Sequence, residues 1–282
     1  MKDYHFTIAG LRTVLRTPYE ITISESLQPF LEYTHKEADC VITLRSCPVL
    51  PAFSEEGVWH GPEYFDCHQG RERRFHCNTP RAEAFAVTQF LENGNIEISV
   101  LPDYLSYFTG TAGIFNRIGM ETLLLQHQGL LLHASLINYK GKAIAFAGPS
   151  GVGKSTQANI WHTLLGADII NGDRAALRKE HDHWFAYGCP YAGTSGIYKN
   201  DCGPLAAIIL LGQAEENHLC RLTEGEAFRY LYPEFSVHHW QKAFVAKATD
   251  LCLQLLAETP IYSLQCRPEQ SAALLVKKGL SL

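Results

Sequence analysis

The segment from Gly148 to Ser155, GPSGVGKS, has residue types and spacing that can hold a chain of phosphates. It fits the pattern G-x-x-x-x-G-K-[ST] at every fixed position. Glycines let backbone N–H groups turn toward an anion, and the amino end of a following helix adds partial positive charge. Lys154 would reach the β- and γ-phosphates, and the Ser155 hydroxyl would bind Mg²⁺. The residues expected to bind the nucleotide are Gly148, Ser150, Gly151, Val152, Gly153, Lys154, Ser155 and Thr156.

A second group with chemical potential is the segment Asp168–Arg174, DIINGDR. Its apolar residues predict a short strand that delivers Asp173 to its carboxyl end, where α/β sheets build their sites. The Asp173 carboxylate could bind Mg²⁺ together with Ser155, or accept a proton from an attacking hydroxyl. The alternative is an aspartate that only stabilises a turn beside Gly172.

The elements that must position these residues follow from the hydrophobic pattern after residue 130. A strand over 130–138, a turn, a buried strand over 143–147, a helix over 155–165 and a strand over 168–171 are expected in that order. Further on, the pattern predicts a strand over 203–211 that pairs with 219–222, and helices over 224–231, 238–258 and 268–278. Mixed strands and helices predict an α/β class for this half.

The first ~105 residues are β-rich, with short strands expected over 5–8, 40–44, 85–87 and 96–101. Asn93-Gly94 is a hairpin turn signal between the last two. One helix is expected over 112–128, ended by Gly129. We therefore expect a smaller β-rich N-terminal domain over 1–110, a candidate for substrate recognition, and a nucleotide-binding domain over 111–282.

His133, the segment from Gly148 to Ser155, and Asp173 together resemble the HPr kinase/phosphorylase family. The fold of that family is related to ATP-dependent phosphoenolpyruvate carboxykinase, so the resemblance implies an HPr kinase-like P-loop kinase domain that uses ATP and Mg²⁺. It implies that Asp173 is the base for the incoming hydroxyl and that His133 lies near the transferred phosphate. Arg174 is a candidate stabiliser of the charge on that phosphate.

The sequence also departs from the family at two places. Gly172 stands where the family has the first of two adjacent aspartates, and the glycine-rich loop over 191–199 differs in its residues. The resemblance covers about residues 125–220, so the chain is expected to be a divergent member. Related divergent kinases phosphorylate peptides on a serine hydroxyl. Lys199, in the loop, is a candidate closing-loop cation or a solvated lysine.

The function that these residues predict is transfer of the γ-phosphoryl group from ATP to a hydroxyl, either a serine of a peptide or protein or a small-molecule alcohol. One alternative is a nucleotide-gated binding protein that needs no base. Another is a carboxykinase-like enzyme acting on an organic acid. The sequence leaves three questions open. These are the identity of the phosphoryl acceptor, whether the nucleotide is ATP or GTP, and whether the chain forms a homo-oligomer.

The composition limits the classes of partner that the chain is expected to bind. The chain has 282 residues, 46% of them hydrophobic and 19% charged, with a formal net charge of -5. That charge provides no basic field for nucleic acid, and no apolar run is long enough to span a membrane. Together with the absence of a signal peptide and of Cys-x-x-Cys pairs, this predicts a soluble cytoplasmic protein with reduced thiols. Cys67-His68 and His76-Cys77 are a weak zinc alternative, against a plain polar hairpin.

Overall fold

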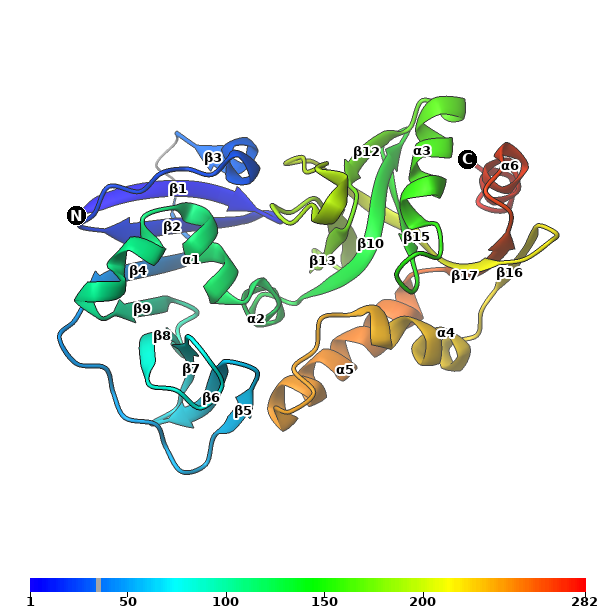
Figure 1. Cartoon of the computed structure of the whole chain (residues 1–282). Coiled ribbons are helices and arrows are strands. Elements are labelled where there is room, and N and C mark those ends of the chain that lie inside the picture. Colours follow the sequence, from blue (N-terminus) through cyan, green and yellow to red (C-terminus); the bar gives the residue numbers. More distant parts are fainter. Residues whose placement is uncertain (34–36) are drawn as a thin grey trace. The chain divides into compact units, whose positions relative to one another are not determined.

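The chain is a mixed α/β protein with two sheets and several helices (Figure 1). The computed structural model describes residues 1–33 and 37–282. These residues form two compact units, Met1–Leu123 and Leu124–Leu282, which are described separately. The division falls after residue 110 because Phe115, on helix α1 (Thr111–Ile118), packs edge-to-face on Phe6 of the N-terminal sheet at a centroid distance of 5.4 Å.

The first unit is built on a nine-stranded sheet in the order β3-β1-β2-β4-β9-β8-β7-β6-β5. All four strands predicted for this region coincide with observed strands. The Asn93-Gly94 turn joins β8 to β9 as an antiparallel pair, which confirms the predicted hairpin. The strands are β1 (Lys2–Ile8), β2 (Leu11–Thr17), β3 (Leu31–Glu32), β4 (Cys40–Ser46), β5 (Val58–His60), β6 (Glu63–His68), β7 (Arg71–Cys77), β8 (Ala84–Phe90) and β9 (Ile96–Val100).

The prediction of a single helix over 112–128 is wrong, because the structure has two helices in this region. Gly119 adopts a left-handed conformation with φ of 75°, which ends α1 and lets α2 (Met120–Gln126) start in a new direction. Two 3₁₀ helices, η1 (Glu25–Phe30) and η2 (Pro102–Phe108), complete the unit.

The zinc alternative fails on the geometry of the β6–β7 hairpin. His68 pairs with Arg71 beside the turn, whereas His76 pairs with Glu63 at the far end. The two Cys-His pairs therefore lie at opposite ends of the hairpin. Within residues 1–33 and 37–282, no group of three or more His, Cys, Asp or Glu side chains is placed to hold a metal ion.

The second unit has an eight-stranded sheet in which β10, β13, β14, β15 and β11 pair in a closed circuit, and β17 and β16 continue from β15. Strand β11 is parallel to β15, and β15 is parallel to β17. These three strands therefore end at the same edge. The bounds are β10 (Gly129–Tyr139), β11 (Lys142–Ala147), β12 (Asp168–Asn171), β13 (Arg174–Glu180), β14 (His183–Tyr187), β15 (Cys202–Gln213), β16 (His218–Arg221) and β17 (Ile261–Cys266).

The central strands of this sheet are buried on both faces. Ile144 and Phe146 contact one core with Trp161, and Ala143 and Ala145 contact the other, as alternation along a strand requires. Helices α3 (Lys154–Leu165) and α6 (Gln270–Gly279) pack together on the first face (Figure 1). Helices α4 (Glu224–Leu231) and α5 (Lys242–Glu258) contribute to the second core, and the short η3 (Gly193–Ser195) and η4 (Tyr232–Glu234) lie in loops.

Two expectations about the second unit are wrong. Strand β16 pairs with β17 and not with β15, because β17 already occupies that edge of β15, with Ile208 opposite Ile261. The helix expected from residue 238 begins only at Lys242. The reason is that His238 folds back and stacks on Phe244 at a centroid distance of 4.3 Å.

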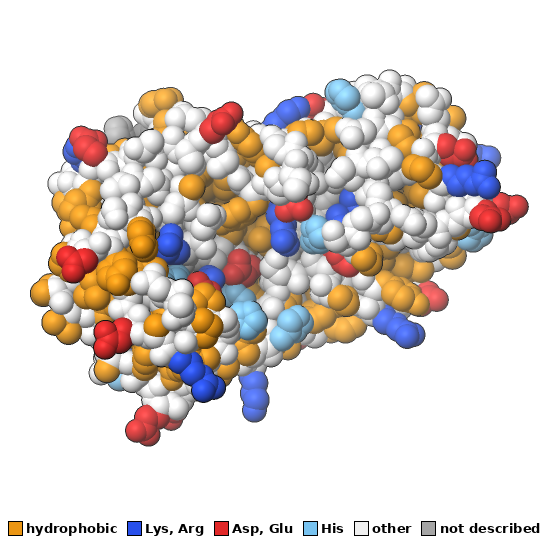
Figure 2. All heavy atoms as spheres, in the orientation of Figure 1, with side chains coloured by type: hydrophobic (Ala, Val, Ile, Leu, Met, Phe, Trp, Pro, Cys, Tyr) orange, Lys and Arg blue, Asp and Glu red, His pale blue; other side chains and the backbone are white. Residues whose placement is uncertain are grey.

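The surface carries mixed charge. On the face drawn in Figure 2, Lys and Arg side chains stand apart from one another among Asp, Glu and apolar side chains. None of the helices within residues 1–33 and 37–282 combines the length and the hydropathy needed to cross a bilayer.

Candidate functional site

The predicted phosphate loop lies between β11, which ends at Ala147, and α3, which begins at Lys154. Gly148 has a φ of 137° and lies against the backbone of Leu211, so a side chain there would be strained and crowded. Gly153 caps the helix with a φ of 116°. The local sequence thus forms the strand-loop-helix unit that directs backbone N–H groups and a helix amino end toward one point.

Lys154 is folded into this loop. Its Nζ donates to the carbonyl oxygens of Gly148 at 2.7 Å and Pro149 at 3.1 Å. Burial lowers the pKa of Lys154, while the charges of Glu234 and Asp173 act to raise it. Both of these acceptors are neutral carbonyls, so the buried ammonium keeps a positive charge that an anion such as a polyphosphate could neutralise.

A cavity of about 290 Å³ opens over this loop. Its lining includes Lys154, Ser155 and Thr156 from the start of α3, together with His133 from β10 and Asp173 from the β12–β13 junction. Ser155 and Asp173 therefore offer hydroxyl and carboxylate oxygens to the same space, which is the donor chemistry that Mg²⁺ prefers. Of the predicted residues, Ser150, Gly151 and Gly153 also line this cavity, whereas Gly148, Val152 and Arg174 do not.

Four charged or titratable side chains meet beside the cavity. His133 Nε2 lies 3.5 Å from Asp173 Oδ1, and His133 Nδ1 lies 3.5 Å from Glu234 Oε2. Arg174 Nε lies 3.3 Å from Asp173 Oδ2, and its Nη1 donates to Ser236 Oγ at 3.2 Å. The imidazole is thus held between two carboxylates, and Asp173 is held between an imidazole and a guanidinium.

The charge state of His133 follows from its surroundings. Burial lowers its pKa, and the positive charges of Lys154 and Arg174 lower it further, against the opposing effect of Asp173 and Glu234. A neutral imidazole is therefore favoured at neutral pH. Its single N–H can donate a hydrogen bond to only one of the two carboxylates at a time.

Asn171 fixes the segment that carries Asp173. Its fully buried side chain accepts hydrogen bonds from the backbone N–H of Asp173 at 2.9 Å and of Arg174 at 2.8 Å. Its amide donates to the carbonyl oxygens of Cys189 at 2.8 Å and Tyr191 at 3.0 Å. One side chain therefore positions the candidate base and anchors the loop that follows residue 190.

That loop leaves no room for a side chain at residue 172. A Cβ built on Gly172 would overlap the side chain of Ser195. A Cβ on Gly193 would lie 2.6 Å from Asp173 Cγ. The loop is thus packed directly against Asp173, and Thr194 and Ser195 line the cavity.

The residues that sequence reasoning missed are Asn171, Glu234 and the loop hydroxyls. Glu234 reaches the site because an antiparallel bridge between Leu132 and Phe235 brings its segment beside β10. The closing-loop role considered for Lys199 is not supported, since its ammonium pairs with Asp168 at the other end of β12.

Comparisons with known proteins do not identify a family for this chain. No family model matches the chain, and no curated protein matches it in sequence. One solved structure found to be similar is the HPr(Ser) kinase/phosphatase from Coxiella burnetii, at 12% sequence identity, over 52% of this chain and 86% of that chain, with a TM-score of 0.32. At that TM-score the likeness adds nothing to what the geometry of the site supports.

Proposed function

We propose that the chain is an ATP- and Mg²⁺-dependent kinase that transfers the γ-phosphoryl group to a hydroxyl of a peptide, a protein or a small alcohol. The observation that supports this most is the single cavity that Lys154, Ser155 and Asp173 line together. A phosphate held by the loop and a hydroxyl that approaches Asp173 would meet inside it.

In the proposed reaction, the acceptor oxygen forms a bond to the γ-phosphorus while the bond from that phosphorus to the β,γ-bridging oxygen breaks. The acceptor proton passes to Asp173, and ADP leaves with the electron pair of the broken bond. Lys154 and the loop N–H groups would bind the phosphates, and the Ser155 hydroxyl would hold the magnesium ion, which leaves the Asp173 carboxylate to take the proton. When bound, that ion neutralises phosphate charge.

His133 and Arg174 assist without touching the metal in this scheme. His133 orients the Asp173 carboxylate from one side, and Arg174 does so from the other while adding positive charge near the transferred group. Because little covalent chemistry falls to the protein, positioning and charge provide the rate.

The test is phosphoryl transfer from γ-labelled ATP with Mg²⁺, using pooled peptides, protein extract, small alcohols and organic acids as acceptors. Labelled product from the wild type, absent with Lys154→Ala, would support a kinase and identify the acceptor class. Binding of MgATP without transfer to any pool would favour the nucleotide-gated binding protein. Transfer only to an organic acid would favour the carboxykinase alternative.

A further inference from the structure

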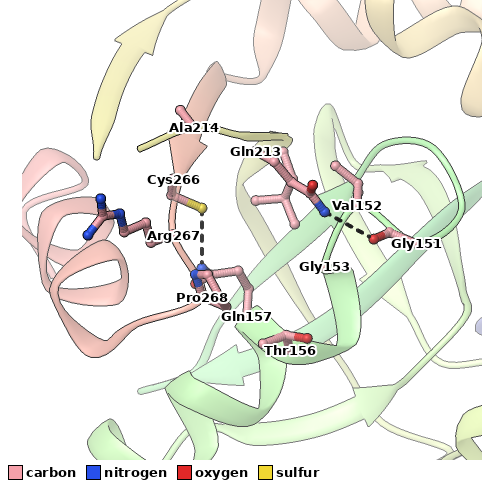
Figure 3. Close-up of a pocket in the computed structure, with 11 residues that line it drawn as sticks. Gly151, Val152, Gly153, Thr156, Gln157, Gln213, Ala214, Cys266, Arg267 and Pro268 are labelled. Atoms are coloured by element: carbon pink, nitrogen blue, oxygen red, sulfur yellow. Dashed lines mark hydrogen bonds between the residues drawn. The ribbon is translucent and has the colours of Figure 1, made fainter. Parts of the chain in front are cut away.

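A second cavity, of about 350 Å³, lies on the other side of the phosphate loop (Figure 3). It shares Gly151, Gly153 and Thr156 with the cavity over the loop. Whereas Lys154, Ser155 and Asp173 face the first cavity, the second is lined mainly by apolar groups. We call it the outer cavity. The further residues that define it here are Gln157, Gln213, Ala214, Cys266, Arg267 and Pro268.

The outer cavity is formed where three parallel strands end. Strand β11 leads into the phosphate loop, β15 ends at Gln213 and β17 ends at Cys266. Ligands of α/β proteins bind outside the carboxyl ends of such strands. The candidate catalytic side chains come from β10 and from the β12–β13 junction. These side chains and the outer cavity therefore lie on two sides of the loop that follows β11.

The wall made by residues 266–269 is held in a defined position. Asn217 Oδ1 accepts from the backbone N–H of Arg267 at 2.9 Å, and the Cys266 carbonyl accepts from the N–H of Ala214 at 3.2 Å. These two hydrogen bonds fix the backbone that forms this wall of the cavity.

One buried polar atom in the wall lacks a partner. Gln157, on α3, is 2% exposed, and its Nε2 donates to Cys266 Sγ at 3.4 Å. Its Oε1 is buried and has no hydrogen-bond partner among the described residues. Figure 3 shows the Gln157 side chain between Thr156 and the Cys266–Pro268 loop, with Gln213 reaching Gly151 across the cavity. A buried acceptor without a partner is rare and costly, and a ligand with polar edges can satisfy it.

We propose that the outer cavity binds the ribose and base of the nucleotide. This rests on the proposed function, since it assumes that the triphosphate is held by the loop. The phosphate chain would run from Lys154 past Thr156, which lines both cavities. The apolar side chains would contact the faces of the base, and Gln213 would reach its polar edge. The exposed Arg267 side chain points away from the cavity in Figure 3 and would turn toward the base when the nucleotide binds.

The test compares the binding of MgATP with that of magnesium tripolyphosphate, which has the phosphates but no nucleoside, by titration calorimetry. Ala214→Phe places a ring inside the outer cavity, and Ala246→Phe places the same ring on an exposed turn of α5. Arg267→Ala removes the guanidinium, with the exposed Lys278→Ala as its control. GTP is titrated in parallel, and the nucleotide that the wild type binds more tightly is the one compared.

Wild type is expected to bind the nucleotide at least about tenfold more tightly than tripolyphosphate. Ala214→Phe should raise the Kd for the nucleotide by about tenfold or more, and Arg267→Ala should raise it by a few-fold. The Kd for tripolyphosphate should stay within about twofold of wild type in both variants. Both control variants should also bind the nucleotide within about twofold of wild type. If all variants bind the nucleotide and tripolyphosphate equally well, the proposal that the outer cavity binds the nucleoside is overturned, while the proposed phosphate site is unaffected. Failure of the folded wild type to bind either would overturn the proposed function as well.

Discussion

The contact between Gly193 and Asp173 gives the sharpest prediction about the site. A Cβ at residue 193 would lie 2.6 Å from Asp173 Cγ, 2.8 Å from Oδ1 and 2.9 Å from Asp173 Cβ. Carbon atoms pack at about 3.5 Å or more, so Gly193→Ala must displace the carboxyl or the loop by about 1 Å. Asp173 would then leave His133 and Arg174. A misplacement of this size costs about 10²-fold in rate when it affects a reacting group.

Gly196→Ala is the matched control for that change. Gly193 has a φ of 52° and Gly196 a φ of 64°, but no atom of the described residues lies within 4 Å of a Cβ at Gly196. Both variants should therefore lose about 1 kcal/mol of unfolding free energy from left-handed strain. Measured by denaturant titration and phosphoryl transfer, only Gly193→Ala should lose about 10²-fold in kcat, with Gly196→Ala within about threefold. Equal losses of kcat in the two variants would refute the placement of Asp173 under the loop.

Three further predictions concern neighbouring and distant groups. Gly172→Asp should lower the rate of phosphoryl transfer because the new side chain meets Ser195. Adding Ser195→Gly should recover most of the lost kcat. Additive losses of kcat in the double variant would contradict the overlap between the two side chains. Glu234→Gln should lower kcat about tenfold by loosening His133, with the KM for ATP unchanged in steady-state assays. In the first unit, burial alone would raise the pKa of Glu63, but hydrogen bonds from His76 and Arg74 lower it to about 2. Its contribution is complete above the ordinary pKa of 4.5, so about 1–3 kcal/mol of stability should be lost as pH falls from about 4.5 toward 2. Burial lowers the pKa of His76 below 6.5, against the Glu63 hydrogen bond that raises it. Stability should therefore already decline as pH falls below about 6.5, because the unfolded chain takes up a proton first; a flat unfolding free energy from pH 7 to 3 would contradict both effects.

The sequence predicts the strand, the glycine-rich loop and the helix around residues 148–155 because their geometry is local. Strand, glycines, lysine and helix are contiguous, so the pattern and the structure coincide from β11 to α3. Asp173 could be placed for a related reason, since it directly follows an apolar strand.

What the sequence did not predict depends on contacts between distant segments. Glu234 reaches His133 only through the bridge between Leu132 and Phe235, and no local pattern indicates that bridge. Asn171 has the sequence pattern of an ordinary strand residue, and only its hydrogen bonds to the backbone at residues 173, 174, 189 and 191 indicate its positioning role. Similarly, the partner of β16 depended on β17, whose apolar and polar residues are too mixed to predict a buried strand.

The most direct test of the central claim compares nucleotide binding and phosphoryl transfer in Asp173→Asn. The asparagine keeps the shape of the side chain and removes its ability to accept the proton. We predict that the Kd for ATP stays within about threefold of wild type while the transfer rate falls about 10²- to 10⁴-fold. Unchanged transfer in this variant would contradict the assignment of Asp173 as the base and, with it, the kinase mechanism proposed here.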